Sequence, residues 1–328
     1  MIEPNPVSTL LEIAGGYCVP RCLHVVANLG VADALDETPR TAAELAASVG
    51  AHPDALDRVL RLLSAHGVFE CHGDDFRHSP ASRLLRTDHP QSMRAFARMI
   101  GLPVMWALYG ALEHSVRTGR PAADKILPGG LWAHFSEHPE EGGLFNAAMV
   151  AKAHGAVAGV VAAYDFSGFR LIGDIGGGRG HLLQAVLDRA PSAKGVLFDQ
   201  PHVIKEVAGL ASERLTLQAG DFFKDKLPAC DAYLVMEVIH DWNDADSVSI
   251  LEAIRRAAPL HAKLLLIETM VPDDPGPHWS KNLDIHMLTF IGGRQRTQEG
   301  YSALLAKAGF SFKREIDTGA GISILEAA

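Results

Sequence analysis

Apolar residues along the first part of the chain follow the period of amphipathic helices. Over residues 1–95 they recur three and four positions apart, the spacing that places them on one helical face. Thr41 and Glu44 fit a capping box that opens a short helix over Ala42–Val49. A longer apolar stripe follows and ends at His66. These patterns predict an N-terminal unit made mainly of helices.

A short β-hairpin is predicted directly after these helices. Val68–Cys71 and Phe76–His78 flank a turn of Gly and Asp residues. Helix, turn, helix and hairpin together outline a winged helix, which raises the hypothesis of a DNA-binding regulator. The second helix carries two cations and two carboxylates: Arg58, Arg61, Asp54 and Asp57. Because it lacks the basic face that phosphate neutralisation requires, a structural or dimer-forming role is favoured.

The pattern changes near residue 169. Residues 96–164 still show helical spacing, with glycine-rich breaks between helices. Beyond Phe169, short apolar runs alternate with helix-length segments, which is typical of a parallel, doubly wound sheet. The five strand candidates are 171–175, 195–199, 215–221, 232–239 and 263–270. Two further runs, 310–316 and 321–327, predict a closing antiparallel hairpin.

The composition is that of a water-soluble globular protein. The 328 residues carry 30 Lys and Arg against 39 Asp and Glu, a formal net charge of −9, and 48% of them are hydrophobic. This length suggests two structural units with ample material for a core. The acidic balance disfavours nucleic acid and anionic lipid as partners, because both repel a negatively charged surface.

No segment is expected to cross a membrane or to direct export. The apolar stretch Met99–Leu112 is interrupted by Pro103 and is shorter than the roughly 18 residues that a span requires. The N-terminus lacks a basic region followed by an apolar run and a cleavage site, so a cytoplasmic location is expected. The few cysteines are expected to be reduced thiols: Cys18, Cys22, Cys71 and Cys230. A metal site at the first two is disfavoured, because no second Cys or His pair has finger spacing.

The first strand of the predicted sheet runs into a glycine-rich turn. From Asp174 the sequence reads D-x-G-x-G-x-G, and a helix is expected from about His181. Glycines allow a tight turn and let a ligand approach the backbone. A dinucleotide fingerprint would have its third glycine where His181 stands, whereas Gly180 fits the shorter spacing of proteins that bind S-adenosylmethionine. The turn alone is a weak signal.

Acidic residues end the next two predicted strands. Asp199 ends the second strand and could accept hydrogen bonds from ribose hydroxyls. It could instead simply cap the helix that begins at Pro201. Asp221 ends the third strand, where a carboxylate could bind an adenine amino group while Phe222 covers the ring. Because successive strand ends meet at one sheet edge, the pattern predicts a nucleoside site there.

A histidine follows the fourth predicted strand. His240 would lie at its carboxyl end, beside the sulfonium of the cofactor, where it could act as a general base. Glu268 ends the neighbouring fifth strand and could orient the imidazole or stabilise its charge. Because the chain has 16 histidines, position rather than residue type singles out His240.

Several of these motifs together resemble a known family. GDIGGGRG, FDQP, GDFF, VIHDW, IETMVP and LDIHMLTFIGGRQRT are similar to motifs of the plant-type S-adenosylmethionine-dependent small-molecule O-methyltransferases, which include bacterial antibiotic-tailoring and acetylserotonin methyltransferases. GYCVPRCLHVVANLGVADAL resembles the N-terminal dimerisation domain of that family, and LFNAAM resembles its substrate lid. The resemblance covers nearly the whole chain, and the ordered set is more specific than any single motif.

The resemblance implies a set of cofactor and catalytic residues. It places S-adenosylmethionine, and its product S-adenosylhomocysteine, among Gly176, Gly178, Asp199, Asp221, Phe222 and Met236. His240 matches the family's catalytic base, with Glu268 as one flanking acid and Asp241 beside it. Gln295 stands where a second acid usually precedes Arg-Thr. A glutamine can hydrogen-bond an imidazole but cannot stabilise imidazolium by charge, so His240 acts either as a base or by positioning the acceptor.

The same resemblance implies an acceptor pocket, for which ordinary helix core is the alternative interpretation. Its residues would be Trp106, Phe145, Met149, His286, Met287, Ile291 and Gln295. A second hypothesis places His240, Asp241 and His286 around a metal that chelates an α-keto acid, as in the family's less common C-methyltransferases. The favoured hypothesis involves no metal. The third is the non-catalytic regulator.

The sequence therefore predicts an α/β enzyme of two domains. Residues 1–95 would form a helical, winged-helix-like dimerisation domain. Residues 96–328 would form a Rossmann-like methyltransferase domain with a doubly wound, mostly parallel seven-stranded sheet and a helical lid over about 96–165. The resemblance implies a homodimer in which residues near Leu10–Tyr17 complete the neighbouring site. The expected reaction is methyl transfer to a hydroxyl of a small aromatic secondary metabolite.

Overall fold

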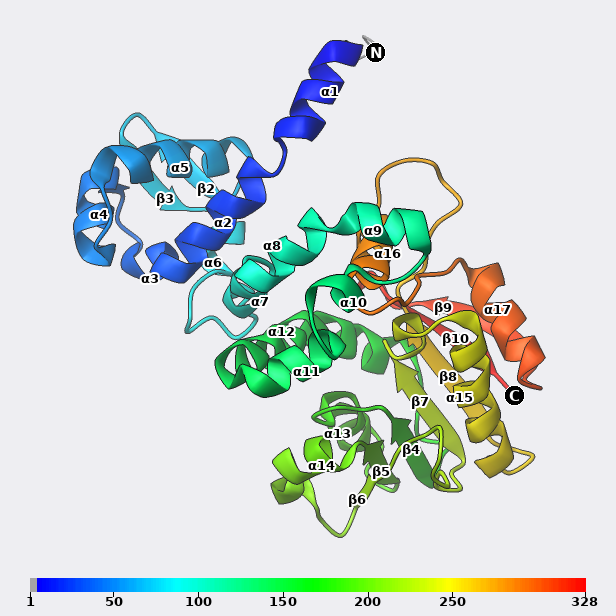
Figure 1. Ribbon diagram of the computed structural model, residues 1–328. Helices are drawn as coiled ribbons and strands as arrows, with labels where there is room; N and C mark the ends of the chain where they lie inside the picture. The colour runs from blue at the N-terminus through cyan, green and yellow to red at the C-terminus, as the bar shows by residue number, and fades with distance from the viewer. Residues whose placement is uncertain (1–4) are drawn as a thin grey trace. The chain divides into compact units, whose positions relative to one another are not determined.

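The computed structural model describes residues 5–328, which divide into two compact units (Figure 1). The first unit consists of the chain through Ala107 together with Trp132–Ala153. The second consists of Leu108–Leu131 together with His154–Ala328. The chain therefore passes from one unit to the other three times.

The first unit is mainly helical, as the spacing of apolar residues predicts. Its elements through residue 100 are α1 (Pro6–Gly15), α2 (Cys18–Leu29), α3 (Val31–Ala34), β1 (Arg40–Thr41), α4 (Ala42–Val49), α5 (Pro53–Ala65), β2 (Phe69–His72), β3 (Asp75–His78), α6 (Pro80–Arg83) and α7 (Arg94–Ile100). Val26, Leu45 and Leu60, from three of the helices, are buried in one cluster with Phe69 and Phe76 of the hairpin. The hairpin therefore closes the helical core.

The predicted hairpin is present and carries a third strand. β2 and β3 pair antiparallel, and the two-residue strand β1 pairs with the other side of β3. The capping box also forms: the Thr41 hydroxyl accepts from the N–H of Glu44, and the Glu44 carboxylate accepts from the N–H of Thr41. The pattern of apolar residues did not reveal β1, because two residues are too few to show an alternation.

Helices fill the chain between the hairpin and the large sheet, as predicted for residues 96–164. They are α7, α8 (Pro103–Gly110), α9 (Leu112–Thr118), α10 (Ala122–Ile126), α11 (Gly130–Glu137) and α12 (Pro139–Ala163). Three of these helices, α8, α11 and α12, each contain a boundary between the two units. Their residues are therefore described with the unit to which they belong.

The second unit is built on a seven-stranded sheet. Its strands are β4 (Leu171–Ile175), β5 (Lys194–Asp199), β6 (Leu215–Ala219), β7 (Ala232–Met236), β8 (Lys263–Glu268), β9 (Phe312–Asp317) and β10 (Ser323–Ala327). Their order across the sheet is β6-β5-β4-β7-β8-β10-β9. β4 to β8 run parallel, whereas β10 pairs antiparallel with both β8 and β9. The five parallel strands and the closing hairpin predicted from the sequence are confirmed.

Helices cover both faces of this sheet, which makes it doubly wound (Figure 1). On one face lie α13 (His181–Arg189) and α14 (Pro201–Glu206), and on the other lie α15 (Asp244–Ala257) and α17 (Gln298–Lys307). The unit also contains α16 (Trp279–Phe290) and the short 3₁₀ turns η1 (Ala208–Leu210) and η2 (Ile239–Asp241). The strand order reverses between β4 and β7. In open α/β sheets, ligands bind at the carboxyl ends of the strands at such a reversal.

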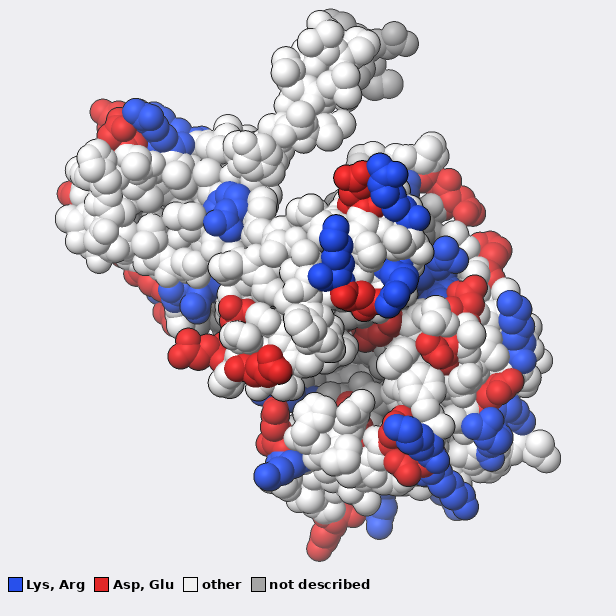
Figure 2. Space-filling model, viewed as in Figure 1, with Lys and Arg blue, Asp and Glu red and all other residues white. Residues whose placement is uncertain are grey.

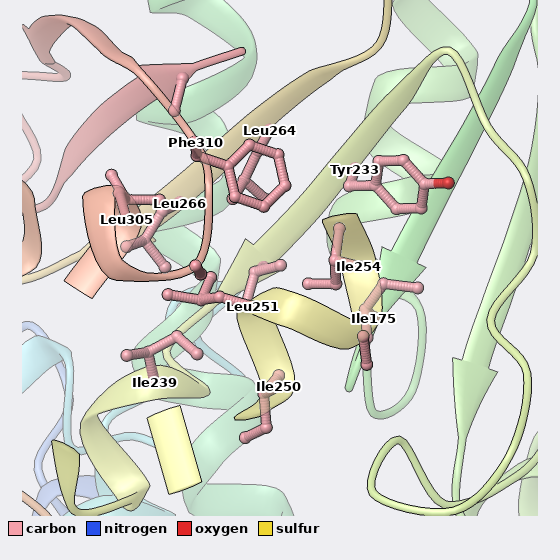
Figure 3. Packing of buried hydrophobic residues seen from close by; sticks show 14 of the residues in the cluster. Ile175, Tyr233, Ile239, Ile250, Leu251, Ile254, Leu264, Leu266, Leu305 and Phe310 are labelled. Atoms are coloured by element: carbon pink, nitrogen blue, oxygen red, sulfur yellow. The ribbon is translucent and has the colours of Figure 1, made fainter. Parts of the chain in front are cut away.

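Alternate strand residues face opposite sides of the sheet and build two cores. On one side, Tyr233 is buried with Ile254 of α15 and Leu305 of α17. Figure 3 shows Ile239 of η2 in the same cluster. On the other side, Leu234 is buried with Leu183 of α13 and its neighbours. Neighbouring residues on a strand point to opposite faces, which is why one apolar run supplies both cores.

Helix α1 is apolar, yet none of its residues is buried within the described chain. Val7, Leu10, Leu11 and Ile13 are 64%, 69%, 69% and 73% exposed. The visible face of this helix is almost entirely free of charged residues (Figure 2). An apolar surface of this kind is typical of a segment that packs against another molecule.

Two helical stretches of the described chain are long and apolar enough to span a membrane by length and composition alone. They are Pro6–Leu29, with 24 residues, and Pro139–Ala163, with 25 residues. Core helices of soluble proteins and signal sequences pass the same test, so the result is weak evidence. The expectation of no span relied on Met99–Leu112, a shorter stretch than either of these, and it stays a prediction.

Candidate active site

The carboxyl end of β4 leads into the glycine-rich turn of residues 176–180. Gly176 and Gly178 have φ angles of 71° and 56°, which glycine adopts without strain. A Cβ atom on Gly177 would overlap the carboxyl group of Asp174, whereas one on Gly178 would meet nothing within 4 Å. The turn is therefore closed toward the sheet and open at Gly178, where a ligand can approach the backbone.

Asp199, the last residue of β5, is bound to this turn. Its Oδ2 accepts the N–H of Gly178 at 2.8 Å, and its Oδ1 accepts the N–H of Gln200 at 2.7 Å. Gly178 and Gln200 both precede the first turn of α14, so Asp199 does not cap that helix, which was the alternative interpretation of this residue. Burial raises the pKa of Asp199. Its position beside the open glycine agrees with the place expected of a ribose ligand.

Asp174 lies inside the sheet directly behind the turn and is 1% exposed. Neither of its carboxyl oxygens has a hydrogen-bond partner within residues 5–328. Burial, followed by the charge of Asp199, raises the pKa of Asp174 from 3.8 to about 7. The folded protein therefore binds this proton more tightly than the unfolded chain does.

We expect Asp174 to make stability fall with rising pH. Its contribution is complete below the unfolded pKa of 3.8 and is lost as the pH rises through about 7, a change on the order of 4 kcal/mol in the free energy of unfolding. Asp174→Asn cannot ionise and should lose this part of the pH dependence. Denaturant unfolding at about pH 5 and about pH 8 measures the part of this change that falls between those values, about 3 kcal/mol, with Asp188→Asn on α13 as an exposed control. Equal pH dependence in both variants would contradict the expectation.

Asp221 and two phenylalanines follow β6 at the same sheet edge. Asp221 Oδ1 accepts the N–H of Phe223 at 2.9 Å. Its Oδ2 pairs with Lys224 Nζ at 2.7 Å, which lowers the pKa of Asp221. The rings of Phe222 and Phe223 contact the ring of Trp242 edge-on, with centroids 5.8 and 4.9 Å apart. A carboxylate beside aromatic surface suits a purine ring.

β7 ends at Met236, three residues before the predicted end of this strand. Glu237 then adopts a left-handed conformation (φ 52°), which no other non-glycine residue of the described chain does. This change of direction leads into η2, which carries His240. A Cβ atom on Gly176 would come within 2.9 Å of Val238, so the turns after β4 and β7 pack closely. The glycine turn and His240 thus share one sheet edge.

His240 is 5% exposed and lies between two carboxylates. Its Nδ1 is 2.9 Å from Oε2 of Glu268, and its Nε2 is 3.3 Å from Oδ1 of Asp241. Glu268 Oε1 accepts the N–H groups of Ile239 and His240 at 3.0 and 3.2 Å. Burial lowers the pKa of His240, but the charge of Glu268 and the bonds with both carboxylates outweigh it and raise the pKa to about 10. The imidazole therefore has a high proton affinity.

Gln295 also contacts the imidazole, in the position where the resemblance implies a second acid. Its Nε2 is 2.9 Å from Nδ1 of His240, and its backbone N–H donates to Oδ1 of Asp284 at 2.8 Å. The hydroxyl of Tyr301 donates to Oε1 of Gln295 at 3.4 Å. Gln295 and Tyr301 are 4% and 0% exposed, so this polar group is isolated from solvent.

Arg296 and Gly293 hold the segment that carries His240. The Arg296 guanidinium donates to the carbonyl oxygens of Ile239 at 3.4 Å and Trp242 at 2.9 Å, on either side of the histidine. The N–H of the residue after Gly293 donates to the carbonyl oxygen of His240 at 2.8 Å. A Cβ atom on Gly293 would overlap that same oxygen. The segment is therefore clamped by side chain and backbone.

We expect Gly293→Ala to displace this clamp. The added methyl group would collide with backbone atoms of His240 and Asp241, which cannot turn aside as a flexible side chain can. Turnover should fall together with stability, by about 1–3 kcal/mol in the free energy of unfolding. Gly209→Ala is the matched control, because its Cβ atom would meet nothing within 4 Å. Equal turnover and unfolding midpoints in the two variants would contradict the expectation.

His286 lies on α16 among three aromatic rings. Its ring centroid is 5.6 Å from those of Tyr109 and Trp279 and 5.5 Å from that of Phe290. Burial lowers the pKa of His286 to about 4, so the ring is neutral near pH 7. Its Nδ1 has no hydrogen-bond partner in the described part of the chain. The neutral ring is partly exposed as a whole, whereas this nitrogen is buried.

The metal hypothesis requires His240, Asp241 and His286 to converge on one ion. Among the described residues, no group of three or more His, Cys, Asp or Glu side chains is placed to hold a metal. Helix α16 gives the reason: Asp284 contacts Gln295 beside His240, and His286, two residues further on, points about 200° around the helix. The geometry therefore does not support the metal-dependent alternative.

The predicted acceptor residues are distributed over both units. Three belong to the first unit: Trp106, Phe145 and Met149. Four belong to the second: His286, Met287, Ile291 and Gln295. All except Gln295 are partly exposed. Within its unit, Phe145 packs its ring against those of Trp132 and Phe135. A role of these residues in acceptor binding stays a prediction.

Comparison with known proteins decides the family. A family model described as the O-methyltransferase domain matches residues 109–311, and a model described as the O-methyltransferase dimerisation domain matches residues 11–88. The chain belongs to the O-methyltransferase family. The predicted resemblance, the Rossmann-like fold with its N-terminal dimerisation domain and the dependence on S-adenosylmethionine are thereby confirmed.

Individual relatives match over nearly the whole chain. The chain is 39% identical to the phenazine O-methyltransferase PhzM of Lysobacter antibioticus, over 98% of this chain and 95% of that protein. It is 40% identical to the 8-amino-8-demethylriboflavin N,N-dimethyltransferase of Streptomyces davaonensis, over 88% and 85%. The solved structure of CalO1, a methyltransferase in calicheamicin biosynthesis in its SAH-bound form, superposes with a TM-score of 0.91 at 33% identity, over 100% and 99%.

Family membership supports a methyltransferase. Nothing in the comparisons supports the non-catalytic regulator or the metal-dependent enzyme. Sequence reasoning did not single out Trp242, Gly293, Arg296 or Tyr301. The first three lie within motifs that carried the resemblance, VIHDW and GGRQRT, so a signal was available for them. No motif pointed to Tyr301.

Proposed function

We propose that this O-methyltransferase methylates a hydroxyl group of a small aromatic metabolite, with His240 as the general base. The observation that carries the proposal is the position of the buried imidazole. It lies between Asp241 and Glu268, at the sheet edge that also bears the glycine turn and Asp199. A proton acceptor and a nucleoside site at one edge are what methyl transfer to a hydroxyl requires.

The strand ends of β4, β5 and β6 fit S-adenosylmethionine. Gly178 leaves room for a ligand, Asp199 offers a carboxylate to the ribose hydroxyls, and Asp221 with Phe222 offers a carboxylate and a ring to adenine. Met236 ends β7 at the same edge and adds a polarisable apolar contact. Bound there, the cofactor supplies an electrophilic methyl group on its sulfonium.

His240 removes the proton of the acceptor hydroxyl. A phenol has a pKa of about 10, close to the value of about 10 for His240, so proton transfer between them costs little. Glu268 and Asp241 stabilise the imidazolium that results. The rest of the rate acceleration comes from holding the acceptor and the cofactor in a fixed relative position. Methyl transfer requires the attacking oxygen to lie roughly 3–3.5 Å from the methyl carbon and in line with the sulfur.

The acceptor is proposed to be a phenolic hydroxyl rather than an amine. The phenazine O-methyltransferase is a 39% identical relative, and a 40% identical relative is named for methylation at nitrogen, so relatives alone leave the atom open. A neutral amine attacks through its lone pair and needs no base beforehand, whereas a phenol gains from losing its proton. The pairing of His240 with two carboxylates therefore favours oxygen.

We also propose a set of residues for the acceptor pocket and an oligomeric state for the enzyme. The acceptor contacts six side chains: Trp106, Phe145, Met149, His286, Met287 and Ile291. Residues 1–95 act as a dimerisation domain in a cytoplasmic homodimer that binds neither nucleic acid nor membrane. The matched dimerisation domain and the exposed apolar surface of α1 support the homodimer. The four free cysteines are consistent with a reducing compartment.

Isotope transfer tests this function. The purified enzyme is incubated with S-adenosylmethionine carrying a ¹³C-labelled methyl group and with a set of phenols, anilines and α-keto acids, with and without a chelator. We expect the label on phenolic oxygen, at a rate that the chelator does not change. Label on aniline nitrogen alone would contradict the proposed acceptor. Label on the carbon of a keto acid, lost with the chelator, would support the metal-dependent alternative instead.

A further inference from the structure

Two side chains lie within hydrogen-bond distance of Nδ1 of His240. The orientation of the Gln295 amide determines whether this nitrogen can carry the proton of the neutral ring. Glu268 Oε2 and Gln295 Nε2 both lie 2.9 Å from this nitrogen. In the orientation described above, the Gln295 amide donates to Nδ1, so a neutral imidazole must carry its proton on Nε2. A ring that is protonated on Nε2 offers no lone pair to an acceptor hydroxyl.

The same orientation leaves a buried carboxylate oxygen unsatisfied. Glu268 is 0% exposed, and its Oε2 has no hydrogen-bond partner of good geometry within residues 5–328. The hydroxyl of Tyr301 instead donates to Oε1 of Gln295 at 3.4 Å, a long bond to a neutral oxygen. Buried polar groups in folded proteins are nearly always paired, and bonds to a carboxylate are stronger than bonds to an amide.

A half-turn of the Gln295 amide pairs every group. Oε1 then accepts from Nδ1–H of His240, and Nε2 donates to the oxygen of Tyr301. The Tyr301 hydroxyl is released to donate to Glu268, with whose side chain it already interacts. Burial, and then the charge of Glu268, raises the pKa of Tyr301 well above its ordinary value, so the hydroxyl keeps its proton and remains a donor. When the imidazole is charged, both ring nitrogens donate, and only this orientation of the amide avoids two facing donors.

We propose that Tyr301 is a positioning residue that fixes the proton of neutral His240 on Nδ1, acting through the amide of Gln295. The inference rests on the proposed function, in which His240 is the base. With its proton on Nδ1, the ring keeps a lone pair on Nε2. The hydroxyl proton of the acceptor moves to that lone pair as the oxygen–methyl bond forms and the sulfur–methyl bond breaks, leaving imidazolium and a neutral thioether.

The test uses Tyr301→Phe, with Tyr233→Phe as the matched control. Both tyrosines are 0% exposed and belong to the same unit, and Tyr301→Phe keeps the ring that the Arg296 guanidinium contacts at 5.8 Å. The Tyr233 hydroxyl donates to the carbonyl oxygen of Pro228 at 2.8 Å and accepts from the N–H of Cys230 at 3.0 Å, both of them backbone groups. Loss of a buried hydroxyl as such should therefore affect both variants alike.

The first readout is the tautomer of His240, which needs no acceptor. Nitrogen NMR of the ¹⁵N-histidine-labelled enzyme, from about pH 6 to about pH 11, follows the signals that disappear in His240→Gln. We expect neutral His240 to carry its proton on Nδ1 in the wild type and in Tyr233→Phe, and at least partly on Nε2 in Tyr301→Phe. A wild-type ring protonated on Nε2, or an unchanged tautomer in Tyr301→Phe, would overturn the inference.

The second readout is turnover. Tyr301→Phe should lower kcat by about 10- to 100-fold with little change in KM, because part of the general-base contribution depends on the tautomer. An ionised carboxylate at position 295 can only accept a hydrogen bond, so it would keep the His240 proton on Nδ1 without help from Tyr301. Tyr301→Phe should therefore lower kcat far less in the background of Gln295→Glu. An equal cost in both backgrounds would overturn the inference. If no phenol is methylated while the tautomer shifts as expected, the proposed function fails and the positioning role stands.

Discussion

His240→Gln is expected to lower kcat by about 10²–10⁴, the range associated with loss of a general base. The substitution keeps a polar group but removes the proton acceptor that lies between Glu268 and Asp241. KM for S-adenosylmethionine should change little, because the carboxylates proposed to bind its ribose and adenine, Asp199 and Asp221, lie at the ends of β5 and β6. Steady-state kinetics with a phenolic acceptor, over a range of pH, measures both constants.

The pH profile adds a test of mechanism. The pKa of His240 is raised to about 10, so the ring is mostly protonated near pH 7. The wild-type rate should therefore rise with pH, because the reaction needs a complex in which one proton has been lost from the ring or from the phenol. His240→Gln should lose the part of this dependence that belongs to the ring. His66→Gln, at an exposed position in the first unit, is the control for a histidine-to-glutamine change. A loss below tenfold would mean that His240 only positions the acceptor.

Asp199→Ala is expected to weaken cofactor binding by about 100-fold or more. A carboxylate that accepts bonds from two ribose hydroxyls loses charge-assisted hydrogen bonds of roughly 1.5–3 kcal/mol each when it is removed. The change also frees the N–H of Gly178, which Asp199 holds at 2.8 Å, so the glycine turn loses an anchor. Asp199→Asn keeps one accepting oxygen and should show a smaller effect.

Calorimetric titration with S-adenosylhomocysteine measures the dissociation constants of these variants. Asp188→Ala, at an exposed position on α13, removes the same group outside the site and should bind as the wild type does. Circular dichroism and thermal unfolding establish that the Asp199 variants are folded. If folded Asp199→Ala binds with wild-type affinity, the ribose site lies elsewhere.

The sheet could be predicted from the sequence because its strands are buried on both faces. An apolar run such as 171–175, followed by glycines and a helical stretch, leaves few alternatives to a parallel strand. Only the ends of strands were misplaced. The apolar run predicts a strand as far as residue 239, whereas β7 ends at Met236 and Glu237 turns the chain in a left-handed conformation that no apolar pattern reveals. β1 is too short for any pattern.

The part of the candidate site that lies at the carboxyl ends of strands could be predicted from the sequence. Asp199 ends β5, and Asp221 and His240 follow β6 and β7 within a few residues. The carboxyl ends of these strands share one edge of the sheet, so topology alone brings the three residues together. Tyr301 and Asp284 could not be found in this way, since their helices, α17 and α16, reach the site through packing. His286 shows the reverse failure: the family resemblance suggests that it lies near His240 in a metal site. It is two residues from Asp284 along α16, however, and this spacing turns its side chain to another face.

The most direct test of the account is titration of the wild-type protein with S-adenosylhomocysteine, because it needs no knowledge of the acceptor. In calorimetric titration, the protein should bind one molecule of S-adenosylhomocysteine per chain, and a chelator should not change the dissociation constant. Elemental analysis of that sample should find no stoichiometric metal. The absence of binding by folded protein would contradict the assignment of the β4, β5 and β6 strand ends to the cofactor, and with it the proposed reaction.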